Sequence, residues 1–155
     1  MKITNNQVFI AQRSLSDLNL GKFDKDVRLA IYKNVGELNA AVKNVQDKME
    51  ASKKELFKDL DEQAAKVGEL RNEYSDEKTT RERKGEIAKE LEAYKEYFEK
   101  EREFIEVTEK FGDDEVKINL EKIDFNKFVD GLVESGKEFN ALQLYALDFL
   151  FIKTK

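Results

Sequence analysis

The stretch that decides the fold is residues 31–56, IYKNVGELNAAVKNVQDKMEASKKEL. Its apolar side chains are separated by alternating steps of four and three residues. The series consists of Ile31, Val35, Leu38, Val42, Val45, Met49, Ser52 and Leu56, with Ser52 as its polar member. A repeat of about 3.5 residues held over such a length is typical of a coiled-coil seam. The pattern therefore predicts a long helix whose apolar edge packs on another helix.

The helical pattern extends beyond this stretch in both directions. After Leu56 the apolar series continues, with a slip of register, through Leu60, Ala64, Val67, Leu70 and Tyr74. The chain of 155 residues contains no proline, so nothing in it breaks long helices in the usual way. We predict a first helical arm over residues 25–74. Gly36 and Gly68 are its weak points, because glycine inside a helix costs about 1 kcal/mol relative to alanine.

A turn and a second arm follow the first. Residues 72–86 are almost entirely polar and are predicted to form the turn. Thr79 followed by Glu82 matches a capping box, which would start the next helix. Four-three apolar spacing then returns over residues 87–105. We expect an arm over residues 80–111 that packs antiparallel against the first one.

The two ends of the chain carry shorter patterns. Val116, Ile118 and Leu120 alternate with polar residues, which is the spacing of a β-strand. The predicted fold is mainly α: a long antiparallel helical hairpin, coiled-coil-like, on a small helical base with a two-stranded β-ribbon of residues 2–4 and 116–120. We expect a single domain, 1–155, in which residues 25–111 form the hairpin projection and residues 1–24 plus 112–155 form the base.

Two groups of side chains are candidates for binding a partner. Residues 139–152 are predicted to form a final helix that is apolar on nearly every face. Such a helix is either buried by several neighbours or docked on a partner. A basic cluster at the predicted hairpin tip is either a solvated turn or a contact for an acidic group. The candidate partner-binding residues are Phe139, Leu142, Tyr145, Phe149, Phe151, Arg81, Arg83 and Lys84.

The composition argues against catalysis. The chain has no histidine and no cysteine, which removes the usual general base, the thiolate nucleophile and the commonest transition-metal ligands. Asp114, Glu115 and Lys117 match the Glu-x-Lys arrangement with which many nucleases hold Mg²⁺. A solvent-exposed edge strand explains the same pattern. We therefore expect no enzyme, no catalytic residue, no cofactor and no metal site.

Charge and hydropathy limit the classes of partner that the chain is expected to bind. A net charge of −5 argues against nonspecific binding of nucleic acid. Residues 1–35 carry an excess of three positive charges, and this excess supports the alternative of a nucleic-acid-binding accessory protein. The longest apolar-rich run, residues 141–152, is too short to span a bilayer. We expect no membrane association, and the absence of cysteine, and so of disulfides, is compatible with a cytoplasmic location.

Several features of layout occur together near the two ends. They are Met1-Lys2-Ile3-Thr4-Asn5, Leu15 with Leu18, Tyr32-Lys33-Asn34, Glu103-Phe104-Ile105, Asp114-Glu115-Val116-Lys117-Ile118 and the Leu-rich segment from Leu142 to Leu150. In this layout the chain resembles small uncharacterised proteins encoded in tailed-phage genomes. The resemblance implies a phage-encoded protein that acts in the infected host cell or in the virion. It transfers no catalytic residues.

These observations predict a non-enzymatic protein–protein interaction module. It would be either an assembly or structural accessory of a phage particle or an inhibitor of a host protein. The partner is then a host or phage protein, and an exposed helical seam also favours a homo-oligomer. A nucleic-acid-binding accessory protein is the alternative. A Mg²⁺-dependent nuclease built on Asp114, Glu115 and Lys117 is a remote one.

Overall fold

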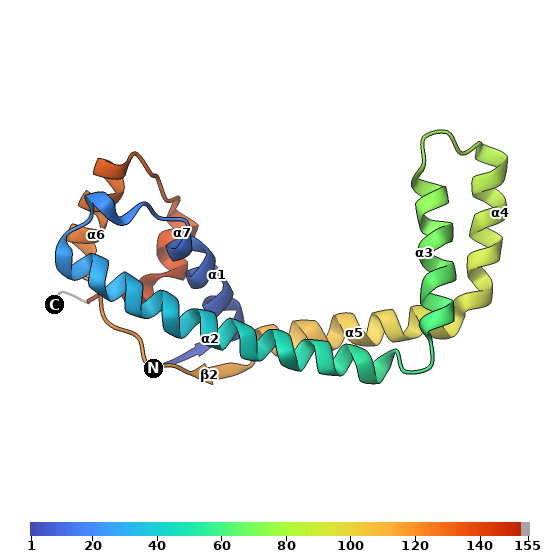
Figure 1. Ribbon diagram of the computed structural model, residues 1–155, viewed down its shortest axis with the longest axis horizontal. Helices are drawn as coiled ribbons and strands as arrows, with labels where there is room; N and C mark the ends of the chain where they lie inside the picture. Colours follow the sequence, from blue (N-terminus) through green and yellow to red (C-terminus); the bar gives the residue numbers. More distant parts are fainter. Residues whose placement is uncertain (153–155) are drawn as a thin grey trace. The chain divides into compact units, whose positions relative to one another are not determined.

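The computed structural model describes residues 1–152, which are mainly α-helical with a two-stranded antiparallel sheet (Figure 1). The predicted mainly α fold class is confirmed. The strands and α-helices are β1 (Lys2–Thr4), α1 (Asn5–Ser16), α2 (Lys25–Leu56), α3 (Asp61–Ser75), α4 (Arg81–Leu91), α5 (Lys95–Asp113), β2 (Glu115–Lys117), α6 (Phe125–Ser135) and α7 (Ala141–Ala146). Short 3-10 helices occur at η1 (Leu20–Lys22), η2 (Glu92–Tyr94) and η3 (Asp148–Leu150).

The chain forms two compact units. Of the described residues, the base unit contains Met1–Asp47 and 111–152, and the hairpin unit, which includes α3 and α4, contains Lys48–Lys110. The sequence predicted a projection beginning at residue 25. The first part of α2 instead belongs to the base unit, because Ile31 and Leu38 are fully buried in that unit's core.

The core of the base unit combines segments from both ends of the chain. Val8 and Leu15 of α1 are buried in the same apolar cluster as Ile31 of α2. The ring of Phe128 on α6 is fully buried, with centroid distances of 5.7 Å to the Phe23 ring and 5.2 Å to the Phe151 ring. Half of the predicted helical seam is thus covered within the same chain.

One polar side chain of α2 is part of this packing. Asn34 is 1% exposed. Its side-chain amide donates to the carbonyl oxygen of Glu121 at 2.9 Å, and its side-chain oxygen accepts from the Glu121 backbone N–H at 2.7 Å. Both hydrogen-bonding ends of the amide are satisfied, so its burial carries no desolvation penalty from an unpaired group. The two bonds hold the chain after β2 against α2.

The β-ribbon lies where it was expected, but its second strand is shorter. β1 pairs antiparallel with β2, with Ile3 opposite Val116. The predicted strand 116–120 is replaced by Glu115–Lys117. The paired region covers only Lys2–Thr4 and Glu115–Lys117, although Ile118 and Leu120 still turn toward the core with the two-residue spacing of a strand.

The prediction of one continuous helix over residues 25–74 is wrong. α2 ends at Leu56, and Asp59 takes a left-handed backbone conformation with φ of 63° before α3 begins. The break follows the slip in apolar register noted after Leu56. It lets the Phe57 ring pack on α5, with centroid distances of 5.4 Å to Tyr97 and 6.3 Å to Phe104. This aromatic contact replaces the helical continuation.

The second arm is interrupted as well. α4 ends at Leu91, and the 3-10 turn η2 precedes α5. The turn between α3 and α4 falls inside the predicted segment 72–86, but Thr80 rather than Thr79 caps α4, by accepting from the Arg83 backbone N–H at 3.2 Å. The Thr79 hydroxyl is committed elsewhere, since it donates to the Glu73 carbonyl oxygen at 2.6 Å.

The predicted C-terminal helix over residues 139–152 is also too long. α7 covers only Ala141–Ala146 and is followed by η3. Phe151 forms an isolated parallel bridge with Ile123. The Ile123 backbone donates to Leu150 at 2.8 Å and accepts from Ile152 at 2.9 Å, so extended pairing replaces helical hydrogen bonds at this end.

Candidate protein-binding surface

The structure separates the C-terminal candidates by their exposure. Phe151 is 5% exposed, and its ring contacts those of Phe125 and Phe128, so it is a core residue rather than a free contact for a partner. Phe139 and Phe149 are half-buried against the core. Leu142 and Tyr145, by contrast, are 78% and 82% exposed.

These two exposed side chains stand on an anchored helix. The side chain of Asn140 accepts from the Gln143 backbone N–H at 2.9 Å, and the Gln143 side-chain oxygen accepts from the Asn140 backbone N–H at 3.0 Å. This reciprocal capping box starts α7. At the other end of α7 the side chain of Leu147 is fully buried. Leu142 and Tyr145 are therefore presented on a capped helix whose C-terminal end is buried in the base unit.

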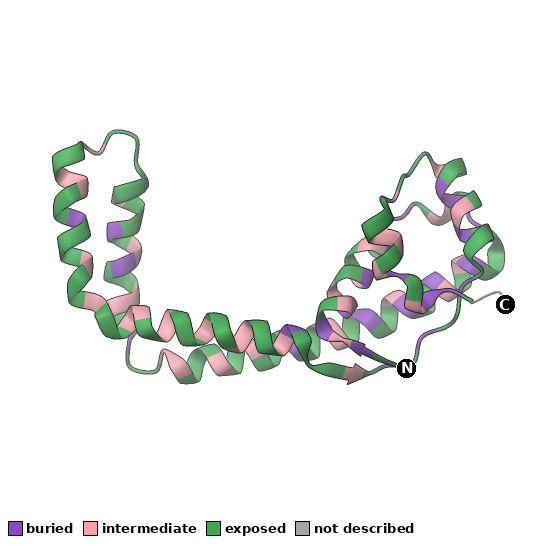
Figure 2. Cartoon of the chain, turned by 180° about the vertical axis from the view of Figure 1, so that it is seen from behind, coloured by how far each residue is buried: buried purple, intermediate pink, exposed green. Residues whose placement is uncertain are grey.

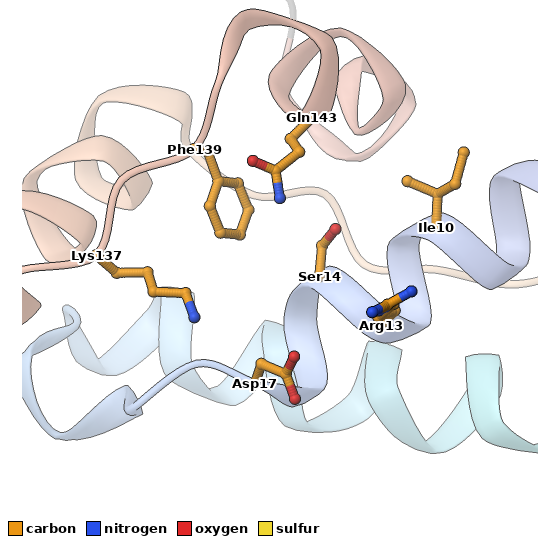
Figure 3. Close-up of a pocket in the computed structure, with 7 residues that line it drawn as sticks. All are labelled: Ile10, Arg13, Ser14, Asp17, Lys137, Phe139 and Gln143. Atoms are coloured by element: carbon orange, nitrogen blue, oxygen red, sulfur yellow. The ribbon is translucent and has the colours of Figure 1, made fainter. Parts of the chain in front are cut away.

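A groove lies between α7 and α1, which are neighbours in the base unit (Figure 3). It has a volume of about 420 Å³. The chain enters it after α6, which ends at Gly136 in the left-handed conformation, with φ of 68°. Its lining side chains are Ile10, Arg13, Ser14, Asp17, Lys137, Phe139 and Gln143.

The groove contains unused hydrogen-bond donors. Within residues 1–152, the side chains of Arg13, Ser14 and Lys137 make no hydrogen bond or ion pair. The side-chain oxygen of Gln143 is used in the capping box, whereas its amide nitrogen points toward Ser14 across the groove (Figure 3). The ring of Phe139 forms one wall of the groove and packs on the Phe128 ring at a centroid distance of 6.0 Å.

The sequence did not predict most of this groove. Phe139 was a candidate, but the lining residues of α1 were not. The groove forms where α1 meets a segment more than a hundred positions later, and no local pattern records that meeting. Ile10 offered a weak signal, since it is apolar but lies outside the helical spacing of Val8, Ala11 and Leu15.

The basic cluster at the turn is engaged within the hairpin unit. Arg83 donates to both carboxylate oxygens of Glu73, at 2.7 and 2.9 Å, and also pairs with Glu86 and Glu90. The hydrogen bonds from Arg83 hold the pKa of Glu73 below its ordinary value. The Lys84 ammonium lies 5.5 Å from the centre of the Tyr74 ring. Arg81 is the exposed member of the cluster.

The candidate nuclease residues lie on the ribbon. Glu115 pairs with Lys2 across the two strands at 3.0 Å, and both side chains are exposed. Lys117 is exposed and Val116 turns inward, as in the alternative interpretation of an edge strand. Across residues 1–152, the acidic side chains form no group of three or more that could hold a metal ion.

Comparisons with known proteins do not identify a family for this chain. In the part of the chain that the structure describes, no helix has the length and apolar character needed to cross a bilayer. The chain matches no protein-family model, no curated protein and no solved structure. No family membership follows, and the resemblance to tailed-phage proteins stays a prediction.

Proposed function

We propose that this protein is a non-enzymatic protein–protein interaction module that binds its partner through the α7 surface, meaning Leu142, Tyr145 and the adjacent groove. One observation carries the proposal: Leu142 and Tyr145 are 78% and 82% exposed on an anchored helix. Residues three positions apart share one helix face, so the two side chains form a common contact. Tyrosine is also among the residues that most often dominate binding energy at protein interfaces.

The rigidity of this surface supports the proposal. Binding is weakened whenever loops and side chains must be ordered at the interface. Here the capping box of Asn140 and Gln143 and the burial of Leu147 already fix the backbone of α7. A partner would therefore meet a preorganised surface.

The composition supports a non-enzymatic role. Without histidine or cysteine, acid–base or nucleophilic steps near neutral pH would depend on carboxylates, lysines and hydroxyls. The nucleic-acid alternative loses support from the hairpin tip, because Arg83 is neutralised by the carboxylates of Glu73, Glu86 and Glu90. A phosphate backbone would have to displace those pairs.

The biological setting follows from the phage resemblance and belongs to the same proposal. The protein acts in the infected host cell or in the virion, either as an assembly accessory or as an inhibitor of a host protein. The seam that favoured a homo-oligomer is partly covered within one chain, since Ile31, Leu38 and Val45 are buried. We therefore place the partner on the α7 surface and propose a different protein as its occupant.

The test is affinity capture from extract of infected bacterial cells with three forms of the protein. The wild type is compared with a Leu142→Ser, Tyr145→Ser double variant and with a matched Leu29→Ser, Tyr32→Ser variant. Leu29 and Tyr32 are exposed apolar residues of α2, so the second variant changes the same chemistry elsewhere in the base unit. A captured protein is then purified, and its affinity for each form is measured by calorimetry.

We expect the wild type and the α2 variant to bind the purified partner with equal affinity. The α7 variant should bind at least tenfold more weakly, since truncating an interface anchor costs about 2 kcal/mol or more. Equal binding by all three forms would contradict the assignment of the surface. The absence of any saturable partner for the wild type would contradict the proposed function itself.

A further inference from the structure

We infer that the groove between α1 and α7 takes an acidic side chain of the partner protein, with an apolar side chain next to it packed on Phe139 and Ile10. The inference rests on the proposed function and names the chemistry of the partner segment. Its occupant is a short peptide segment in which aspartate or glutamate adjoins a large apolar residue.

The hydrogen-bonding groups of the groove define the acidic part. Arg13 and Lys137 carry positive charge and only donate hydrogen bonds, and the amide nitrogen of Gln143 is a further donor. A carboxylate only accepts, so it matches this set better than an amide or an ammonium group does. Charge-assisted bonds from guanidinium or ammonium to carboxylate are also stronger than neutral ones.

The walls of the groove define the apolar part. The Phe139 ring is supported from behind by Phe128, at a centroid distance of 6.0 Å. Ile10 forms part of the opposite wall on α1 and is itself exposed. A volume of about 420 Å³ accommodates a few side chains and no folded element.

The charge balance favours a peptide over a nucleic-acid backbone. The whole chain carries −5, but the groove lining holds two cations, Arg13 and Lys137, against one acid, Asp17. The groove lining therefore attracts an acidic segment, although the net charge of the whole chain is negative. A nucleic acid presents a row of phosphates and needs a row of cations, which a site with two cations and a carboxylate does not offer.

The test begins with a library of short random peptides selected on the immobilised full-length protein. We expect the selected peptides to share an acidic residue beside a large apolar residue. They should bind in solution with affinities that weaken as salt is raised, because exposed charges are screened. Fluorescence polarisation of labelled peptides gives the affinities. A fluorescent oligonucleotide of mixed sequence serves as the probe for the competing ligand class.

Three variants make the test specific. The Arg13→Gln, Lys137→Gln double variant should bind the selected peptides about five- to tenfold more weakly, from the loss of two exposed charge pairs. The control is Lys22→Gln, Lys43→Gln, which changes the same net charge at two exposed lysines of the base unit away from the groove. It should leave the affinity unchanged within twofold. Asp17→Asn removes the repelling carboxylate and should strengthen binding, a gain that damage to the fold cannot produce.

Several results would overturn the inference. They are a selection without acidic peptides, equal losses in the groove and control variants, or no gain with Asp17→Asn. Tighter binding of the oligonucleotide than of the peptides, lost in the groove variant, would assign the site to nucleic acid. If a purified partner needs Leu142 and Tyr145 but is indifferent to Arg13→Gln, Lys137→Gln, this inference fails while the proposed function stands.

Discussion

The base unit and the hairpin unit are stabilised in different ways. The base unit has a continuous apolar core that includes fully buried Phe128 and Leu147. In the hairpin unit, the buried residues are a few aliphatic side chains on α3, on α4 and directly before α3. They are Leu60, Val67, Leu70 and Ile87. Exposed positions dominate α3 and α4 (Figure 2). Several ion pairs also lie within this unit, among them Arg71 with Glu101 and Arg83 with Glu73.

This difference predicts unequal local stability. Burial of apolar surface contributes about 25 cal/mol per Å² and does not depend on pH. Surface ion pairs contribute only about 0–1 kcal/mol each. The hairpin unit, with few buried side chains and many surface pairs, should therefore open more readily than the base unit. The base unit also carries the α7 surface, so the partner is expected to bind the more stable of the two units.

Phe128→Ala is expected to have the largest effect. Removing a fully buried phenylalanine ring costs about 3–5 kcal/mol, and here it also removes support from Phe139 in the groove. In hydrogen-exchange measurements on the full chain, amides of α1 and α6 should lose protection while those of α3 and α4 keep theirs. Phe125→Ala, at an exposed ring of the same helix, is the control and should cost much less. Equal loss of protection in both units would contradict the comparison.

Ile87→Ala provides the converse test in the hairpin unit. Ile87 is fully buried between α4 and α3, and its truncation should cost about 2–4 kcal/mol. The expected loss of exchange protection is confined to α3 and α4, and partner binding at α7 should be unchanged. Ile105→Ala at an exposed position of α5 is the matched control. Weaker binding at α7 with Ile87→Ala would show that the two units are energetically coupled.

The sequence predicted the features that local patterns record. The apolar seam from Ile31 to Leu56 corresponds to one helix, and the ribbon and the α3–α4 turn lie within or beside their predicted segments. These features depend on periodicity and on turn residues, which short windows of sequence contain.

The remaining features depend on contacts between distant residues. The break at Asp59 is stabilised by the packing of Phe57 on Tyr97 and Phe104, and the extended backbone after η3 by pairing with Ile123. In both places a tertiary contact overrides a continuous helical pattern. No local pattern records the groove for the same reason, since Arg13 and Lys137 come to line one groove only after folding.

The smallest expected effect is the loss of stability on acidification. Arg71 of α3 donates to both carboxylate oxygens of Glu101 of α5, each at 2.7 Å, and its guanidinium lies 5.2 Å from the centre of the Phe98 ring. The hydrogen bonds from Arg71 lower the pKa of Glu101 below its ordinary value of 4.5, although partial burial opposes the shift. A lowered pKa in the folded state means that the pair stabilises the protein above the unfolded pKa. That contribution is lost as the pH falls through the folded value.

Acidification from pH 6 to below the ordinary value of 4.5 should therefore destabilise the hairpin unit before the base unit. The share due to this pair is below about 1 kcal/mol, because Arg71 is half exposed and solvent screens the interaction. Exchange of α3 amides measured across this pH range gives the slope. Glu101→Gln removes the titrating group and should flatten the slope. The control is Glu103→Gln, which changes a carboxylate of the same helix that pairs with Lys100. This control should leave the α3 slope as in the wild type. A slope unaltered by Glu101→Gln would mean that apolar packing, and not the Arg71 pair, holds α3 against α5.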